Sequence, residues 1–85
     1  MKIVIESHIP YIQGLLEPYA QVCYLETAQI TAEALRDAQV LITRTRTKCN
    51  EALLRHSAIQ MIATATIGTD HIDLDYCRRA GIKVV

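Results

Sequence analysis

The sequence lacks several features that mark common protein classes. Its cysteines, Cys23, Cys49 and Cys77, are odd in number and form no Cys-x-x-Cys pair. They therefore predict neither a disulfide framework nor a structural zinc site, and three reduced thiols suit a cytoplasmic protein. Lys and Arg together number 9, as do Asp and Glu. This balance gives no indication of a nucleic-acid or membrane partner.

Long apolar runs and nucleotide-binding loops are also missing. The first apolar run, Ile3–Ile5, is broken by Glu6 and is too short for a signal peptide or a membrane span. No Gly-x-Gly-x-x-Gly and no Gly-Lys-Ser/Thr occurs in the 85 residues. The sequence therefore has no signature of a dinucleotide or phosphate loop, and its length leaves room for one small domain.

Short β-branched runs alternate with amphipathic stretches along the chain. The predicted strands are 3–5, 22–25, 40–42, 61–63 and 82–85, and the predicted helices are 10–17, 31–38, 50–56 and 70–80. Strict alternation predicts a parallel sheet with crossover helices. A strand-to-strand spacing of roughly 20 residues favours a compact flavodoxin-like order, in an α/β fold with helices on both faces of the sheet.

Polar residues and one glycine are predicted to set the helix ends. Thr31, Asn50, and either Thr69 or Asp70 are placed to cap helix N-termini, and Gly81 suits the position after a helix. The sequence stops at Val85 in the fifth predicted strand, with no helix after it. Because a buried parallel strand is normally covered on both faces, we expect the chain to be a segment of a longer protein.

Two segments follow predicted strands at the sheet edge where open α/β folds bind ligands. In Thr43–Lys48, an extended backbone would place Arg44, Arg46 and Lys48 on one side. Arginine forks match carboxylate and phosphate oxygens, so this segment could hold an anion. A solvated basic loop at the sheet rim is the alternative interpretation, and the residues alone leave both open.

The second segment is Ala63–His71, after the fourth predicted strand. Its small residues would let a ligand approach the backbone, and Gly68 can adopt a positive φ. The next helix would begin here, with free amides at its N-terminus that favour an anion. The alternative interpretation is an ordinary tight turn between a strand and a capped helix.

The remaining titratable residues fit structural roles. Acidic residues between 70 and 75 match a first helical turn, where carboxylates complement the helix dipole, so no metal site is predicted there. His8 is expected to make an ordinary loop hydrogen bond and His56 to close a helix. Cys77 is expected to pack inside a helix and not to act as a nucleophile.

Both candidate segments resemble passages of a known family. Residues 44–50 read R-T-R-T-K-C-N and are similar to its R-S-x-T-K-V-N passage, and residues 63–73 read A-T-A-T-I-G-T-D-H-I-D and are similar to its G-T-A-T-x-G-T-D-H-x-D passage. The family is the erythronate-4-phosphate dehydrogenases, a branch of the D-isomer-specific 2-hydroxyacid dehydrogenases. The departures are Thr45 for serine, Ala63 for glycine, and Glu6-Ser7-His8 for D-E-N.

The resemblance implies a two-domain enzyme in which residues 1–85 form the N-terminal part of the substrate domain. The NAD-binding domain and the catalytic residues would lie outside this chain, which alone would be inactive. Thr45 and Thr66 would bind substrate, and the charge argument adds Arg44 and Arg46. The implied reaction is NAD-dependent oxidation of 4-phospho-D-erythronate to 2-oxo-3-hydroxy-4-phosphobutanoate in pyridoxal 5'-phosphate biosynthesis, by a cytoplasmic homodimer.

Two alternatives stay open at this point. The first is another D-2-hydroxyacid dehydrogenase, because the second passage occurs in looser form across that family. The second is a non-enzymatic α/β module that binds small anions. A receiver-like signalling domain is disfavoured, because it needs an aspartate at the end of the third strand, where this sequence has Thr43 and Arg44.

Overall fold

The computed structural model describes residues 1–9, 14–44, 47–64 and 71–85. Its elements, in chain order, are β1 (Lys2–Glu6), β2 (Gln21–Leu25), the 3-10 helix η1 (Thr27–Gln29), β3 (Val40–Thr43), α1 (Glu51–Leu54), β4 (Met61–Thr64), α2 (Leu74–Ala80) and β5 (Lys83–Val84). Each of the five predicted strands is present, with its ends shifted by at most one residue. The short β-branched and apolar runs were therefore reliable indicators of strands.

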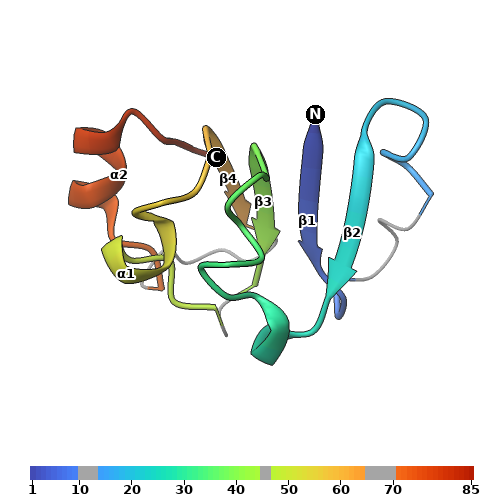
Figure 1. The fold of residues 1–85 in the computed structure, drawn as a ribbon, viewed down its shortest axis with the longest axis horizontal. Coiled ribbons are helices and arrows are strands. Elements are labelled where there is room, and N and C mark those ends of the chain that lie inside the picture. Colours follow the sequence, from blue (N-terminus) through green and yellow to red (C-terminus); the bar gives the residue numbers. More distant parts are fainter. Residues whose placement is uncertain (10–13, 45–46, 65–70) are drawn as a thin grey trace.

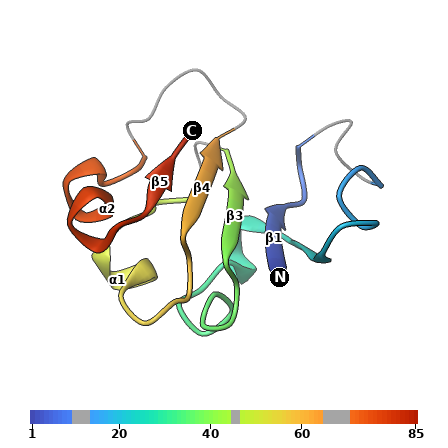
Figure 2. The same cartoon turned by 90° about the horizontal axis from the view of Figure 1, so that it is seen from above.

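The strands form one parallel sheet in the order β2-β1-β3-β4-β5. Figure 2 shows β1, β3, β4 and β5 side by side with their arrows pointing the same way. This is the flavodoxin-like order, so the predicted fold class is confirmed. Because all strands are parallel, their carboxyl ends gather at one edge of the sheet.

Alternate residues of each strand enter two separate apolar clusters, one on each face of the sheet. Val4, Leu41 and Ile62 pack with residues of both α-helices, including Leu54 and Cys77. Figure 1 accordingly places α1 and α2 beside each other. On the other face, Ile3, Ile5 and Val40 pack against the chain between β1 and β2, through the partly buried Ile9, Leu16 and Ala20. Helices therefore cover one face in the described part of the chain, where the sequence predicted helices on both.

Two predicted helices are absent from the described residues. Of the stretch 10–17, residues 10–13 lie outside them, and Gly14 to Glu17 forms turns, with Gly14 at a φ of 89° that no α-helix allows. The stretch 31–38 forms successive turns, although Thr31 Oγ1 accepts from the Ala34 amide at 3.2 Å as a cap would. Segments this short are marginal helices, and here Leu35 is fully buried within the turns.

The other two helices form, but are shorter than predicted. α1 begins after the cap Asn50, whose Oδ1 accepts from the Leu53 amide at 3.1 Å, and ends before His56. α2 begins after Asp73, three residues beyond the predicted cap Asp70, and ends at Gly81 as predicted, with a φ of 76°. The described residues contain no helix long and apolar enough to cross a membrane.

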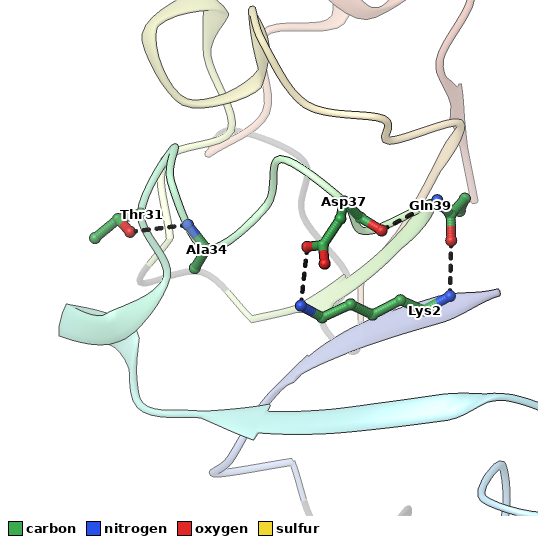
Figure 3. Close-up of polar contacts among 5 residues, drawn as sticks. All are labelled: Lys2, Thr31, Ala34, Asp37 and Gln39. Carbon is green, nitrogen blue, oxygen red and sulfur yellow. Dashed lines mark hydrogen bonds and ion pairs between the residues drawn. The ribbon is translucent and has the colours of Figure 1, made fainter.

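A polar cluster closes the amino edge of the sheet between β1 and β3 (Figure 3). The Lys2 amide donates to Gln39 Oε1 at 2.7 Å, and the Gln39 amide donates to the Lys2 carbonyl at 2.9 Å. The Lys2 ammonium also pairs with Asp37 at 2.9 Å. Reciprocal hydrogen bonds thus join the amino ends of β1 and β3, which pair in the register Ile3 with Val40.

Candidate functional site

The carboxyl ends of β1 and β3 form the point where the strand order reverses. From β1 the chain passes to β2 on one side, and it then returns to β3 on the other side. In open parallel sheets, loops diverge at this point and leave a crevice for ligands. Glu6 ends β1, and Thr43 ends β3 immediately before Arg44.

Arg44 is the predicted substrate contact that the structure describes. Its side chain is exposed, and its Nη1 donates to the His8 carbonyl oxygen at 2.9 Å across the gap between the two strand ends. No carboxylate in the described part of the chain forms an ion pair with it. The other guanidinium N–H groups can therefore receive an anion at the sheet edge.

The other predicted contacts, Thr45, Arg46 and Thr66, lie outside the described residues. On either side of residues 45–46, Thr43 and Thr47 are buried, whereas Arg44 and Lys48 are exposed. The predicted common side of Arg44, Arg46 and Lys48 stays a prediction, because Arg46 lies outside the described residues.

A short backbone bridge joins the two segments that the sequence singled out. The Cys49 amide donates to the His71 carbonyl at 2.8 Å, and the Asp73 amide donates to the Cys49 carbonyl at 2.8 Å. Helix caps follow at once on both sides, at Asn50 and Asp73. Cys49 and residues 71–73 are thus held beside each other, directly before the two helices.

The thiol of Cys49 lies beneath this bridge. The side chain is fully buried, and its Sγ donates to the Thr47 carbonyl at 3.7 Å. Burial in the apolar core, with a smaller contribution from Cys77, raises the pKa of Cys49 to about 12. Cys77 is buried in the same cluster, where burial also raises its pKa, so its predicted packing role is confirmed. Neither thiol is suited to nucleophilic chemistry.

Glu6 is a site residue that sequence reasoning did not identify. Its side chain is 1% exposed, although it carries a carboxylate. Oε1 accepts from the His8 amide at 3.2 Å and from Thr27 Oγ1 at 3.5 Å. The available signal was a charged residue placed directly after an apolar strand, because such positions lie at the ligand-binding edge.

His8 and His56 both lie at the surface beside charged side chains. His8 Nε2 lies 3.8 Å from the Glu26 carboxylate, and both side chains are exposed. His56 is exposed beyond α1 and lines a shallow surface hollow with Glu33 and Arg36. Within residues 1–9, 14–44, 47–64 and 71–85, no group of three or more His, Cys, Asp or Glu side chains lies close enough to hold a metal ion.

Fold and site together define a parallel α/β domain of flavodoxin-like strand order with a cation at its switch point. Residues 3–85 match the sequence profile of the family described as D-isomer specific 2-hydroxyacid dehydrogenase, catalytic domain. The chain belongs to this family. Its match covers the whole sheet, both helices and the bridge between the two passages.

Individual relatives agree with this assignment. An erythronate-4-phosphate dehydrogenase of Bacteroides thetaiotaomicron is 50% identical over 84 residues, which are 98% of this chain and 24% of the relative. An NAD+-bound 3-phosphoglycerate dehydrogenase of Entamoeba histolytica superposes with a TM-score of 0.81 at 25% identity, covering 99% of this chain and 32% of that one. A D-lactate dehydrogenase of Aquifex aeolicus, complexed with NAD and lactic acid, gives 0.75 at 26% identity, covering 96% and 26%. The chain spans 22% to 24% of the length of the curated relatives it matches.

Proposed function

We propose that this chain is the N-terminal part of the substrate domain of an NAD-dependent dehydrogenase that oxidises 4-phospho-D-erythronate to 2-oxo-3-hydroxy-4-phosphobutanoate. The observation that carries the proposal is the exposed guanidinium of Arg44 at the switch point of the sheet. The chain is also 50% identical to an erythronate-4-phosphate dehydrogenase. A phosphorylated hydroxy acid has two oxyanion groups. A bidentate arginine is suited to either of them.

Within this proposal the chain binds substrate and leaves the chemistry to other parts of the protein. Arg44 and Arg46 contact an oxyanion of the substrate, and Thr45 and Thr66 donate hydroxyl hydrogen bonds to it. The residues present do not fit NAD: the three glycines, Gly14, Gly68 and Gly81, are far apart in sequence and form no dinucleotide fingerprint. NAD and the catalytic groups therefore belong to a second domain, and residues 1–85 alone have no activity.

The biological setting follows from the same proposal. Oxidation of 4-phosphoerythronate serves pyridoxal 5'-phosphate biosynthesis. A cytoplasmic location is supported by three free cysteines, two of them buried in the core. The whole protein is proposed to be a homodimer that binds neither nucleic acid nor membrane.

Steady-state kinetics of the full-length protein that carries this chain test the proposal. With NAD present, we expect turnover of 4-phosphoerythronate to exceed that of 3-phosphoglycerate and D-lactate. Arg44→Ala should raise KM for 4-phosphoerythronate about tenfold to a hundredfold, because a hydrogen bond to a charged group contributes about 1.5–3 kcal/mol. Arg44→Lys should give a KM between those of the wild type and Arg44→Ala, since lysine keeps the positive charge and loses the bidentate geometry of the guanidinium.

Lys83→Ala is the matched control. It removes the same charge from an exposed residue at the start of β5, at the opposite edge of the sheet, and should leave KM unchanged. A KM for Arg44→Ala within about twofold of the wild type would refute the role of Arg44. A preference for D-lactate would replace the proposed substrate with that of another branch of the family.

A further inference from the structure

Glu6 is a carboxylate buried at the switch point, and its position calls for an explanation. A charged group taken out of water destabilises the fold by several kcal/mol unless partners compensate for it. Yet only Oε1 has hydrogen-bond partners, and in the described part of the chain Oε2 has none. Stability alone would favour an apolar residue here, as at Ile5 next to it. The carboxylate therefore points to a role in the site.

The contacts of Glu6 lead through one residue, His8, to Arg44. Glu6 Oε1 accepts from the amide of His8, and the carbonyl of His8 accepts from Arg44 Nη1 at 2.9 Å. The same turn is held at its other amides, because Ser7 donates to the Leu25 carbonyl and Ile9 to the Glu6 carbonyl. The Glu6 side chain thus holds the peptide unit before His8, and the Glu6 backbone carbonyl holds the unit that carries the His8 carbonyl. Residue His8 is fixed on both sides by Glu6, and its carbonyl in turn holds the guanidinium.

We propose that Glu6 is a positioning residue, which aligns Arg44 for anion binding by fixing the backbone of His8. The proposal rests on the function proposed above and adds a residue to the same site. Glu6 itself does not touch the substrate, because its side chain is closed off from solvent. Its effect is preorganisation: an arginine already held in place loses less conformational freedom when the anion binds.

Two substitutions at Glu6 separate the hydrogen bond from the charge. Glu6→Gln keeps an acceptor oxygen for the His8 amide and removes the charge. Glu6→Met fills a similar buried volume with an apolar chain and offers the amide no comparable acceptor. We expect Glu6→Met to raise KM for 4-phosphoerythronate about fivefold, with kcat changed less than about twofold, because one ordinary hydrogen bond contributes on the order of 1 kcal/mol. Glu6→Gln should stay within about twofold of the wild type.

A double-mutant cycle with Arg44→Ala, in the full-length protein, decides whether Glu6 acts through Arg44. If it does, Glu6→Met should change KM by less than about twofold once Arg44 is already alanine. Gln39→Ala is the control for general destabilisation, because it removes a hydrogen bond between β1 and β3 at the opposite edge. It should lower the melting temperature and leave KM unchanged.

The possible outcomes distinguish this inference from the proposed function. Multiplicative effects of Glu6→Met and Arg44→Ala on KM would overturn the positioning role while leaving Arg44 as a substrate contact. An equal rise of KM in Glu6→Gln and Glu6→Met would also overturn it, because the acceptor would then not matter. A wild-type KM in Arg44→Ala would overturn the proposed function and the inference together.

Discussion

The buried thiol of Cys49 allows a direct test of the bridge between the two loop segments. Alkylation by iodoacetamide requires the thiolate, and the pKa of Cys49 is raised by burial from 9.0 to about 12. At pH 8 this difference of three pH units reduces the thiolate population roughly a thousandfold. The side chain is also fully buried, so reagent can reach it only when the bridge opens. Both effects slow the reaction.

Cys23 is the internal reference, because it is only partly buried in the edge strand β2. The native protein would be treated with iodoacetamide at pH 8 and digested at intervals, and each cysteine would be quantified by mass spectrometry. We expect Cys49 to react at least about a thousandfold more slowly than Cys23. In urea the cysteines should react alike.

Alkylation of Cys49 within about tenfold of the rate of Cys23 in the native protein would refute this reasoning. It would mean that the Cys49–Ile72 bridge is open for much of the time and cannot hold the two segments together.

Two further predictions concern stability. Asp73→Ala removes the carboxylate that accepts from the Tyr76 amide at 3.0 Å, and urea titration should show a loss of about 1 kcal/mol, whereas Asp73→Asn should retain most of it. Raising the pH above 9 should destabilise the fold, because the unfolded Cys49 thiol ionises there while the folded thiol keeps its proton to about pH 12. The stability gap between the wild type and Cys49→Ala should therefore narrow by up to about 1.4 kcal/mol per pH unit; a gap constant from pH 8 to 10.5 would contradict this.

The sheet was predictable because each strand carries its own local signal. β-branched runs, alternating with stretches long enough for a crossover, leave few topologies for five strands. The helices were predicted less well, because their lengths depend on tertiary packing. Gly14 adopts a left-handed conformation, and the segment around Leu35 turns tightly to bury that side chain. Neither choice is visible in a hydrophobic pattern.

In the candidate site too, some features could be predicted from the sequence and others depend on tertiary contacts. Arg44 could be predicted, because it follows a buried strand and the carboxyl edge is where such folds bind ligands. Glu6 could not be recognised as buried, since its partner Thr27 becomes a neighbour only when β2 pairs with β1. The Cys49 bridge depends on residues far apart in sequence, which meet only in the folded chain.

The bridge between Cys49 and Ile72 also has a consequence for changing substrate preference by mutation. Two peptide hydrogen bonds connect Cys49, which follows β3 along the chain, to His71 and Asp73, which follow β4. A substitution in either segment that shifts the backbone is transmitted to the other, even where the two side chains never touch. Mutant libraries intended to alter substrate specificity should therefore vary both segments together and leave residues 49 and 72, which form the bridge, unchanged.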